Sequence, residues 1–374
     1  VPNFIGGEGI QMQGIDSDYI LIMIDGSPLI GRSSGTLDLN RISLGNIKQI
    51  EIVKGASSSL YGSEALGGII NIITDQNKKN GFTKEFSYRY GSFNTHEGTI
   101  NLGYRKNNFF ISGFVNAINS IGYDLVKSDS LKTVNPYNNL TNNLKVEYKI
   151  SEKSNIYGSF RIYNQNQENS SLIQNEVLYG NSEIDDWNFK MKYSHQIFDN
   201  LKANLELYNS RYKTYEYLNE INGSLYSSSK FNQYFLRPEL QIKYEIDKSN
   251  NLVFGIGNTF EKLNRTEFST TPKYHSQFIY QQYDWKPSNL TNIIIGGRFD
   301  NHNVYNSQLS PKAAIFQKIN EKLTIKSSIG YGFKAPDFRQ LYLDFTNSSA
   351  GYSVLGYNIA DKKIDEMKKN NELN

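Results

Sequence analysis

The stretch NLKVEYKI (143–150), followed by the turn SEKS (151–154), shows the pattern that decides the fold of this chain. Its apolar and polar residues alternate one by one. Successive side chains of a β-strand point to opposite faces, so such a segment has one apolar and one charged surface. The apolar surface holds Leu144, Val146, Tyr148 and Ile150, and the polar surface holds Asn143, Lys145, Glu147 and Lys149. The same alternation occurs in WNFKMKYSHQI (187–197), LKANLELY (201–208), RPELQIKYEI (237–246) and KLTIKSSIGY (322–331).

Short polar turns separate these segments at regular intervals. They are RKNN (105–108), SEKS (151–154), DN (199–200), DKSNN (247–251), KPSN (286–289) and NEK (320–322). About 30 to 45 residues lie between consecutive turns, whereas two membrane-crossing strands need only about 9–11 residues each. We therefore expect long loops at the opposite ends, for example in NQNQENSSLIQNEVLYGNS (164–182). Short turns on one rim and long loops on the other are typical of an outer-membrane β-barrel.

A soluble β-sandwich or jelly roll is the alternative, because its strands also alternate. A sandwich, however, gives no reason for short and long connections to alternate. The count of strands between Thr83 and Phe333 is about thirteen, and a single-chain bacterial barrel closes with an even number. We therefore predict an incomplete barrel that lacks its last strands. The charged end DKKIDEMKKNNELN (361–374) is interpreted as a shortened outer loop.

The composition limits the function classes. Apolar residues make up 38% of the 374 residues, but aromatic residues reach 13%, with 27 tyrosines. Tyrosine has an apolar ring and a polar hydroxyl, so many tyrosines are consistent with side chains at a membrane–water interface. The net charge is only +3, which does not indicate a nucleic-acid partner, and the absence of cysteine excludes disulfides and thiolate chemistry. We predict no cofactor, and no apolar run approaches the ~18 residues of a membrane-spanning helix.

The first ~80 residues follow a different pattern from the rest. DYILIMIDGSPLI (18–30), IKQIEIV (47–53) and LGGIINIIT (66–74) are dense runs of Ile, Leu and Val bounded by Gly, Asp and Ser. Such runs indicate strands covered on both faces. The polar segment DQNKKNGFTK (75–84) is interpreted as a linker. We expect two domains, an α/β plug portion at 1–80 and a barrel portion at 81–374.

The motifs of the first domain carry a family resemblance. IQMQGIDSDYILIMIDGSPL (10–29) and LDLNRISLGNIKQIEIVKGASSSLYGSEALGGIINIIT (37–74) resemble the second half of the plug domain of TonB-dependent outer-membrane receptors. GYGFKAPDFRQLYL (330–343) is similar to a stretch of the receptor barrel. The resemblance implies an all-β transmembrane barrel of about 22 strands around a plug, of which about 13 strands and half of the plug are present here.

The resemblance also implies a function. Such receptors, located in the bacterial outer membrane and surrounded by its lipid, take up a scarce nutrient in a process driven by a TonB-type protein in the periplasm. An iron–siderophore complex is the expected ligand, with cobalamin or haem as alternatives. The resemblance implies that plug loops facing outward contact the ligand. For haem, it implies that a histidine on an outer loop binds the iron. The candidates are Arg32, Ser33, Ser34, Tyr61 and His302 for ligand binding, and Lys54 for a contact between plug and barrel wall.

Two other function classes remain open from the residues. A passive porin has no need of the plug-like first 74 residues. An enzyme needs a site, but Asp185 and Asp186 are neighbours on one strand and point to opposite faces. We predict no catalytic or metal site. The Gly- and Ser-rich part of IEIVKGASSSLYGSEALGGIINIIT (50–74) is interpreted as an element of low stability that rearranges during transport.

Overall fold

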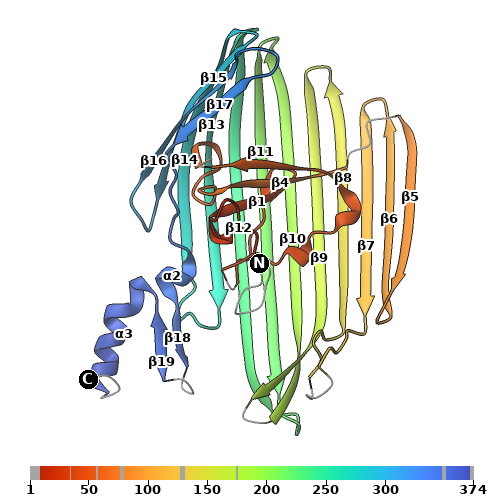
Figure 1. The fold of residues 1–374 in the computed structure, drawn as a ribbon, viewed down its shortest axis with the longest axis vertical. Helices are drawn as coiled ribbons and strands as arrows, with labels where there is room; N and C mark the ends of the chain where they lie inside the picture. Colours follow the sequence, from red (N-terminus) through yellow and green to blue (C-terminus); the bar gives the residue numbers. More distant parts are fainter. Residues whose placement is uncertain are drawn as a thin grey trace.

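The protein was analysed as a computed structural model that describes residues 9–33, 35–55, 58–75, 80–126, 131–173, 176–347 and 351–370. Its largest part is a thirteen-stranded antiparallel sheet in which each strand pairs with its neighbours in sequence (Figure 1). The strand number agrees with the prediction. The strands are β5 (Gly81–Gly91), β6 (Thr95–Lys106), β7 (Phe109–Ser120), β8 (Tyr137–Ser151), β9 (Ser154–Ile173), β10 (Glu176–Phe198), β11 (Leu201–Asn219), β12 (Leu225–Asp247), β13 (Asn250–Arg265), β14 (Lys273–Ser288), β15 (Thr291–His302), β16 (Gln308–Lys318) and β17 (Thr324–Gly330).

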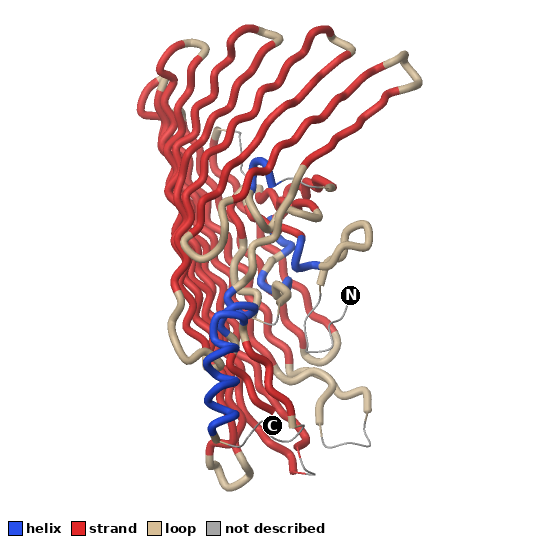
Figure 2. Tube along the Cα trace, turned by 90° about the vertical axis from the view of Figure 1, so that its left-hand side faces the viewer, coloured by secondary structure: helices blue, strands red, loops and turns tan. Residues whose placement is uncertain are grey.

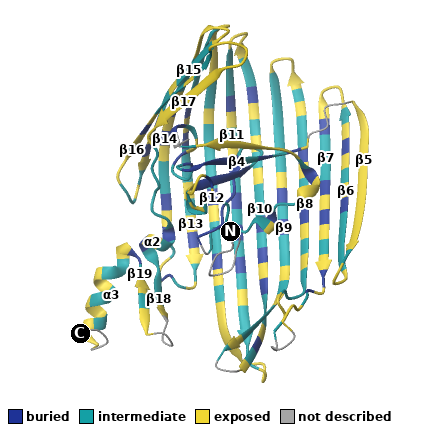
Figure 3. Cartoon of the chain, in the orientation of Figure 1, coloured by how far each residue is buried: buried dark blue, intermediate teal, exposed yellow. Residues whose placement is uncertain are grey.

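The alternation of side chains gives this sheet two different faces. On the outward face, large apolar side chains stand free of contact, and Leu205 and Ile256 are about half exposed. On the inward face, polar and aromatic side chains such as Lys145, Tyr208 and Tyr212 are almost completely buried. Burial therefore changes over one or two residues along the central strands, whereas β5 and β17 at the two edges are exposed along almost their whole length (Figure 3). An apolar outside and a polar inside are the arrangement of a membrane barrel.

The short turns lie where the sequence predicts them, but the expected long loop at 164–182 is wrong. Strands β9 and β10 continue through this segment, and their ladder pairs residue by residue from Ser154–His195 to Ile173–Glu176. The predicted outer-loop position of His302 is corrected as well, because this residue is the last one of β15. Backbone groups that pair with a neighbouring strand need no irregular loop to satisfy them. The polar Asn and Gln side chains mark strands that extend beyond the apolar band.

Four strands between Ile20 and Thr74 form a separate small sheet with strand order β2-β1-β4-β3. Strands β1 and β4 are parallel and buried, as predicted, and an apolar cluster with Ile20, Leu29 and Ile70 packs around them. The small sheet lies against one face of the large curved sheet (Figure 2). Its elements are β1 (Ile20–Ile24), β2 (Ser27–Pro28), β3 (Ile47–Lys54), β4 (Gly68–Thr74), the helix α1 (Ser58–Tyr61) and the 3₁₀ turns η1 (Ser17–Tyr19), η2 (Leu39–Arg41) and η3 (Leu44–Asn46).

Strand β3 differs from the prediction that all three apolar runs are covered on both faces. Ile50 and Ile52 are 54% and 56% exposed. The physical reason is that β3 is an edge strand of the small sheet. Only its pairing with β4 covers it within the described residues.

The last part of the chain lies beside one end of the large sheet (Figure 1). It contains α2 (Phe338–Tyr342), the hairpin of β18 (Asp344–Asn347) and β19 (Tyr352–Leu355), and α3 (Tyr357–Lys369). Asp337 caps α2 by accepting a hydrogen bond from the backbone N–H of Gln340, and the Gln340 side chain bonds back. Part of the segment 361–374, predicted as a loop, is thus helical. Among the described residues, no helix is long and apolar enough to cross a membrane.

Candidate functional site

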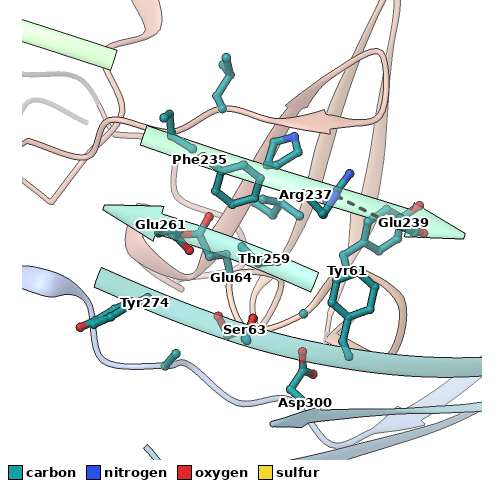
Figure 4. Close-up of a pocket in the computed structure, with 18 of the residues that line it drawn as sticks. Tyr61, Ser63, Glu64, Phe235, Arg237, Glu239, Thr259, Glu261, Tyr274 and Asp300 are labelled. Atoms are coloured by element: carbon teal, nitrogen blue, oxygen red, sulfur yellow. Dashed lines mark ion pairs between the residues drawn. The ribbon is translucent and has the colours of Figure 1, made fainter. Parts of the chain in front are cut away.

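A cavity of about 670 Å³ lies between the small sheet and the inward face of the large one. The small sheet contributes the turns at 25–32 and 60–64, the large sheet contributes strands β10 to β15, and the segment 333–339 closes one side. Figure 4 shows Tyr61, Ser63 and Glu64 opposite side chains of β12 to β15. The cavity thus lies at the boundary between the two bodies, and residues of both line it.

The strongest link between the two bodies is a buried triad. Asp186 on β10 is held by two guanidinium groups, Arg41 of the small sheet at 3.1 Å and Arg161 of β9 at 2.8 Å. The side chains of Arg41 and Asp186 are 0% and 1% exposed. Arg41 also donates to the carbonyl of Ile30 at 2.8 Å and lies over the ring of Tyr212. Arg161 donates to the carbonyl of Arg41. A buried charge needs such partners, because desolvation penalises it heavily.

A second link forms at the turn between β1 and β2. Asp25 has φ 49°, a left-handed conformation, and its carboxylate accepts from the backbone and hydroxyl of Thr74. Lys145 of β8, 2% exposed, approaches the same carboxylate at 3.0 Å. Lys190 of β10 donates to the carbonyl of Asp25 at 2.9 Å. The turn is therefore fixed by charges from two strands of the large sheet.

Further contacts reach the backbone of the small domain. Tyr208 donates to the carbonyl of Pro28 at 2.7 Å, and Arg265 donates to the carbonyl of Ser33 at 2.8 Å. The ring of Tyr212 lies so close to Gly31 that a Cβ atom there would stand 2.3 Å from ring carbons. Gly31 also has φ +93°, which favours glycine. Close approach and turn geometry together explain why this position is glycine.

Two cations of the cavity wall, Arg32 and Lys334, are only loosely paired with a carboxylate. Arg32 donates through its two terminal nitrogens to the carbonyls of Ser17 and Ile20, at 3.0 and 2.7 Å. Its Nε is buried without a hydrogen-bond partner, and the Glu64 carboxylate lies 4.0 Å from it. Lys334 approaches Glu64 from the other side at 3.9 Å. At 3.9 and 4.0 Å, neither contact with Glu64 is within hydrogen-bond distance.

An aromatic group adjoins these charges. Tyr274 stacks on Phe338 with ring centroids 3.8 Å apart, and its buried hydroxyl has no hydrogen-bond partner among the described residues. His302 stacks on Tyr305 at 3.7 Å and meets Tyr274 edge-on. Its Nδ1 accepts a bond from the backbone N–H of Val304 at 3.1 Å. In a neutral ring, this hydrogen bond leaves the proton on Nε2.

The sequence-predicted site residues divide into two groups. Arg32, Tyr61 and His302 line the cavity, and Arg265 binds the backbone of Ser33 beside it. Burial raises the pKa of Tyr61, with smaller contributions from the carboxylates of Glu51 and Glu239, so its hydroxyl stays neutral. Ser34 lies outside the described residues.

Lys54 is placed elsewhere, at the exposed end of β3. The contacts between small domain and wall are instead made by Arg41, Asp25 and the strand residues that bind them. Sequence reasoning missed these residues. A buried Arg has no local signal, whereas the parity of the strands could have placed Lys145 and Asp186 on the inward face.

A sheet that is apolar outside, polar inside and occupied by a second domain defines a plugged outer-membrane receptor. Comparison with family models agrees. Residues 3–69 match the TonB-dependent receptor plug domain, and residues 53–362 match the TonB-dependent receptor-like β-barrel. The chain belongs to the TonB-dependent receptors, a family of outer-membrane β-barrel proteins.

Relatives with known names show the same architecture. The chain is 25% identical over 359 residues to the vitamin B12 transporter BtuB of Vibrio cholerae, with 90% of this chain and 55% of that protein covered. It is 24% identical over 377 residues to the iron-regulated outer membrane virulence protein of the same species, covering 93% and 54%. The siderophore receptor PirA of Acinetobacter baumannii has a similar fold, with TM-score 0.69, 18% identity and coverage of 88% and 55%. The chain spans about half the length of these relatives.

Proposed function

We propose that the intact protein is an energy-coupled receptor that takes up a scarce nutrient across the outer membrane. The observation that carries this proposal is the plug itself, which is seated on the inward face through buried charges and leaves a cavity between the two bodies. A passive pore gains nothing from such a seated plug. We further propose that residues 1–80 act as the plug portion and 81–374 as the wall, and that neither has a catalytic role.

We propose an iron–siderophore complex as the ligand. Such complexes are large, rich in oxygen and often contain flat rings. Support comes from the buried, unpartnered Nε of Arg32 and from the unpartnered hydroxyl of Tyr274. The rings of Tyr305 and His302 add a platform on which a flat group stacks.

We propose a TonB-type protein in the periplasm as the energy-transducing partner, acting from the rim that carries the short turns. Force on the plug then breaks a small number of links rather than an extended apolar interface. The triad at Asp186 and the ion pair at Asp25 are the links that must open. Breaking each link costs about several kcal/mol. This free energy must be supplied by the pulling protein, and it keeps the plug from leaving the wall by thermal motion.

Uptake of labelled ferric siderophores by cells that express the intact protein tests the function. We expect uptake to stop when the proton-motive force is dissipated. Arg32→Gln is expected to weaken binding about tenfold or more, because one charge-assisted hydrogen bond is lost. Lys48→Gln, on the exposed strand β3, serves as the matched control. Labelled cobalamin in the same assay distinguishes the ligand class.

Two outcomes contradict the proposal. Uptake that continues unchanged without the proton-motive force indicates a passive pore. Equal binding by Arg32→Gln and the control shows that the cavity residue does not contact the ligand, even if transport is energy-coupled.

A further inference from the structure

The outward face of the large sheet carries a row of basic side chains in register. Arg211 of β11 pairs with Tyr234 of β12, Tyr234 with Lys262 of β13, and Lys262 with Lys273 of β14. These four residues are called the basic row. Their sequence neighbours Tyr212, Gln233 and Tyr274 face the plug or the cavity, so the basic row faces outward. Lys213 and Lys230 lie one and two rows further toward the long strand ends.

The basic row lies at the border of the apolar band. Ten residues back along the strands, the row Leu201–Tyr244–Leu252–Tyr283 stands in the same register beside the short turns. Ten residues span about 33 Å along a strand, and a strand tilt near 40° reduces this to about 25 Å, the height of the apolar band of such barrels. The basic row therefore sits at the outer membrane–water interface.

The row next to it on the membrane side has apolar side chains on its two central strands, β12 and β13. Leu236 pairs with Phe260, and the ring of His275 stacks on Phe260 at 4.6 Å. On β11 the corresponding position is Asn209. Neither row contains an acidic residue on β11 to β14. An anion bound here is thus in contact with cations on the water side and with the apolar side chains of Leu236 and Phe260 on the lipid side.

The positive charges of the row oppose one another. Lys262 and Lys273 are directly opposite cross-strand partners, both exposed, and like charges in this position destabilise a sheet. Within the described residues, neither has an ion-pair partner. The Arg211 guanidinium lies over the ring of Tyr234 at 4.8 Å and donates to the Asn232 side chain at 3.0 Å, so it is held in place. An anion between the lysines removes their repulsion.

We propose that the basic row is a binding site for the phosphate group of an outer-leaflet lipid. The lysines supply point charges and Arg211 a planar pair of donors, both suited to phosphate oxygens. The acyl chains run along Leu236 and Phe260 into the membrane. Lipid is the occupant that fits, because only a lipid places a phosphate at this depth while its chains cover the apolar residues below.

Binding of bisphosphorylated lipid A to the intact protein in neutral-phospholipid nanodiscs tests the site. Native mass spectrometry counts the bound lipid. We expect Lys262→Gln/Lys273→Gln to bind about tenfold more weakly or worse, because two charge-assisted contacts to phosphate are lost. Lys262→Arg/Lys273→Arg is expected to keep binding. The matched control Lys84→Gln/Lys106→Gln removes two exposed lysines on β5 and β6 and is expected to leave binding unchanged.

Three results overturn the proposal. Lipid A bound equally by wild type and the Lys262→Gln/Lys273→Gln variant shows that the row is merely solvated. An equal loss in the control pair shows an unspecific charge effect. Dephosphorylated lipid A that binds as tightly as the phosphorylated form excludes phosphate as the recognised group. Nutrient uptake is measured separately, so failure here leaves the proposed transport function untouched.

Discussion

Replacing Asp186 by Asn removes the one carboxylate shared by two buried guanidinium groups. The substitution keeps the size of the side chain but places an amide where two cations converge. Arg41 keeps its bonds to the carbonyls of Ile30 and Asp38, so the local fold of the small domain survives. What is lost is the charge that ties Arg41 to the wall and neutralises Arg161.

The free-energy cost of Asp186→Asn follows from the burial of the two arginines. Removing one partner of a buried pair costs about 3–5 kcal/mol, because the remaining charge is left uncompensated. Both arginines are nearly inaccessible, with side-chain exposures of 0% and 6%, so solvent screening relieves little of this cost. A loss of 3–5 kcal/mol corresponds to roughly 100- to 4,000-fold more frequent release of the plug segment.

Native-state hydrogen exchange of the intact protein measures this release. Peptides that cover 35–46 report on the attachment of Arg41, whereas strands of the barrel report on the wall. Asp185→Asn is the matched control, since Asp185 faces outward, is 50% exposed and pairs with Lys213 at 3.4 Å. An exposed pair contributes about 0.2–1 kcal/mol, so the control changes exchange less than about fivefold, and only on the wall.

The reasoning is refuted if Asp186→Asn, like the control, leaves the exchange at 35–46 unchanged. The triad then does not attach the plug segment to the wall. A second variant separates charge from packing. Arg41→Met, Arg161→Met and Asp186→Leu together replace the triad by apolar side chains, and such replacements are often neutral or stabilising. If the triple variant exchanges faster than Asp186→Asn alone, the penalty does not arise from unpaired charge.

Two further substitutions test the close contacts of the plug, with the same exchange measurement. Gly31→Ala is expected to destabilise the plug by about 2–4 kcal/mol, because the new Cβ meets the Tyr212 ring in a left-handed backbone, whereas Gly14→Ala, with open space at φ +79°, costs about 1–2 kcal/mol. Equal effects at both positions contradict the clash. Tyr208→Phe leaves the Pro28 carbonyl unpaired and is expected to cost about 1–3 kcal/mol; unchanged exchange at residues 20–30 shows that water replaces the hydroxyl.

The large sheet was predictable because its signals are local. Alternation over eight residues fixes which side chains share a face, and polar turns fix where a strand ends. This sufficed for the strand number and for the opposite orientation of Asp185 and Asp186, which the structure confirms. The loop prediction at 164–182 failed because polarity was taken as a sign of irregular backbone. Beyond the membrane, a strand with polar side chains on both faces is equally stable when its ladder continues.

The links between plug and wall were not predictable from local pattern. Arg41 and Asp186 are 145 residues apart, and nothing near either residue indicates its partner. The family resemblance directed attention to Lys54, on a strand that the structure leaves at an exposed edge. The alternation along each strand shows which wall residues face inward. Which of these residues contact the plug depends on how the plug is rotated inside the barrel. That rotation is set by long-range packing.

The nature of these links bears on how the plug moves. An apolar interface weakens gradually as its area is exposed, whereas a buried ion pair is lost almost completely once water enters. The plug is held by a few charged anchors, Arg41 and Asp25 among them, and by hydrogen bonds to backbone carbonyls. Its own core, around Ile20 and Ile70, does not depend on the wall. In the proposed transport, we therefore expect a pull that admits water at the anchors to release the plug as a folded unit, while the ladders of the barrel wall remain intact.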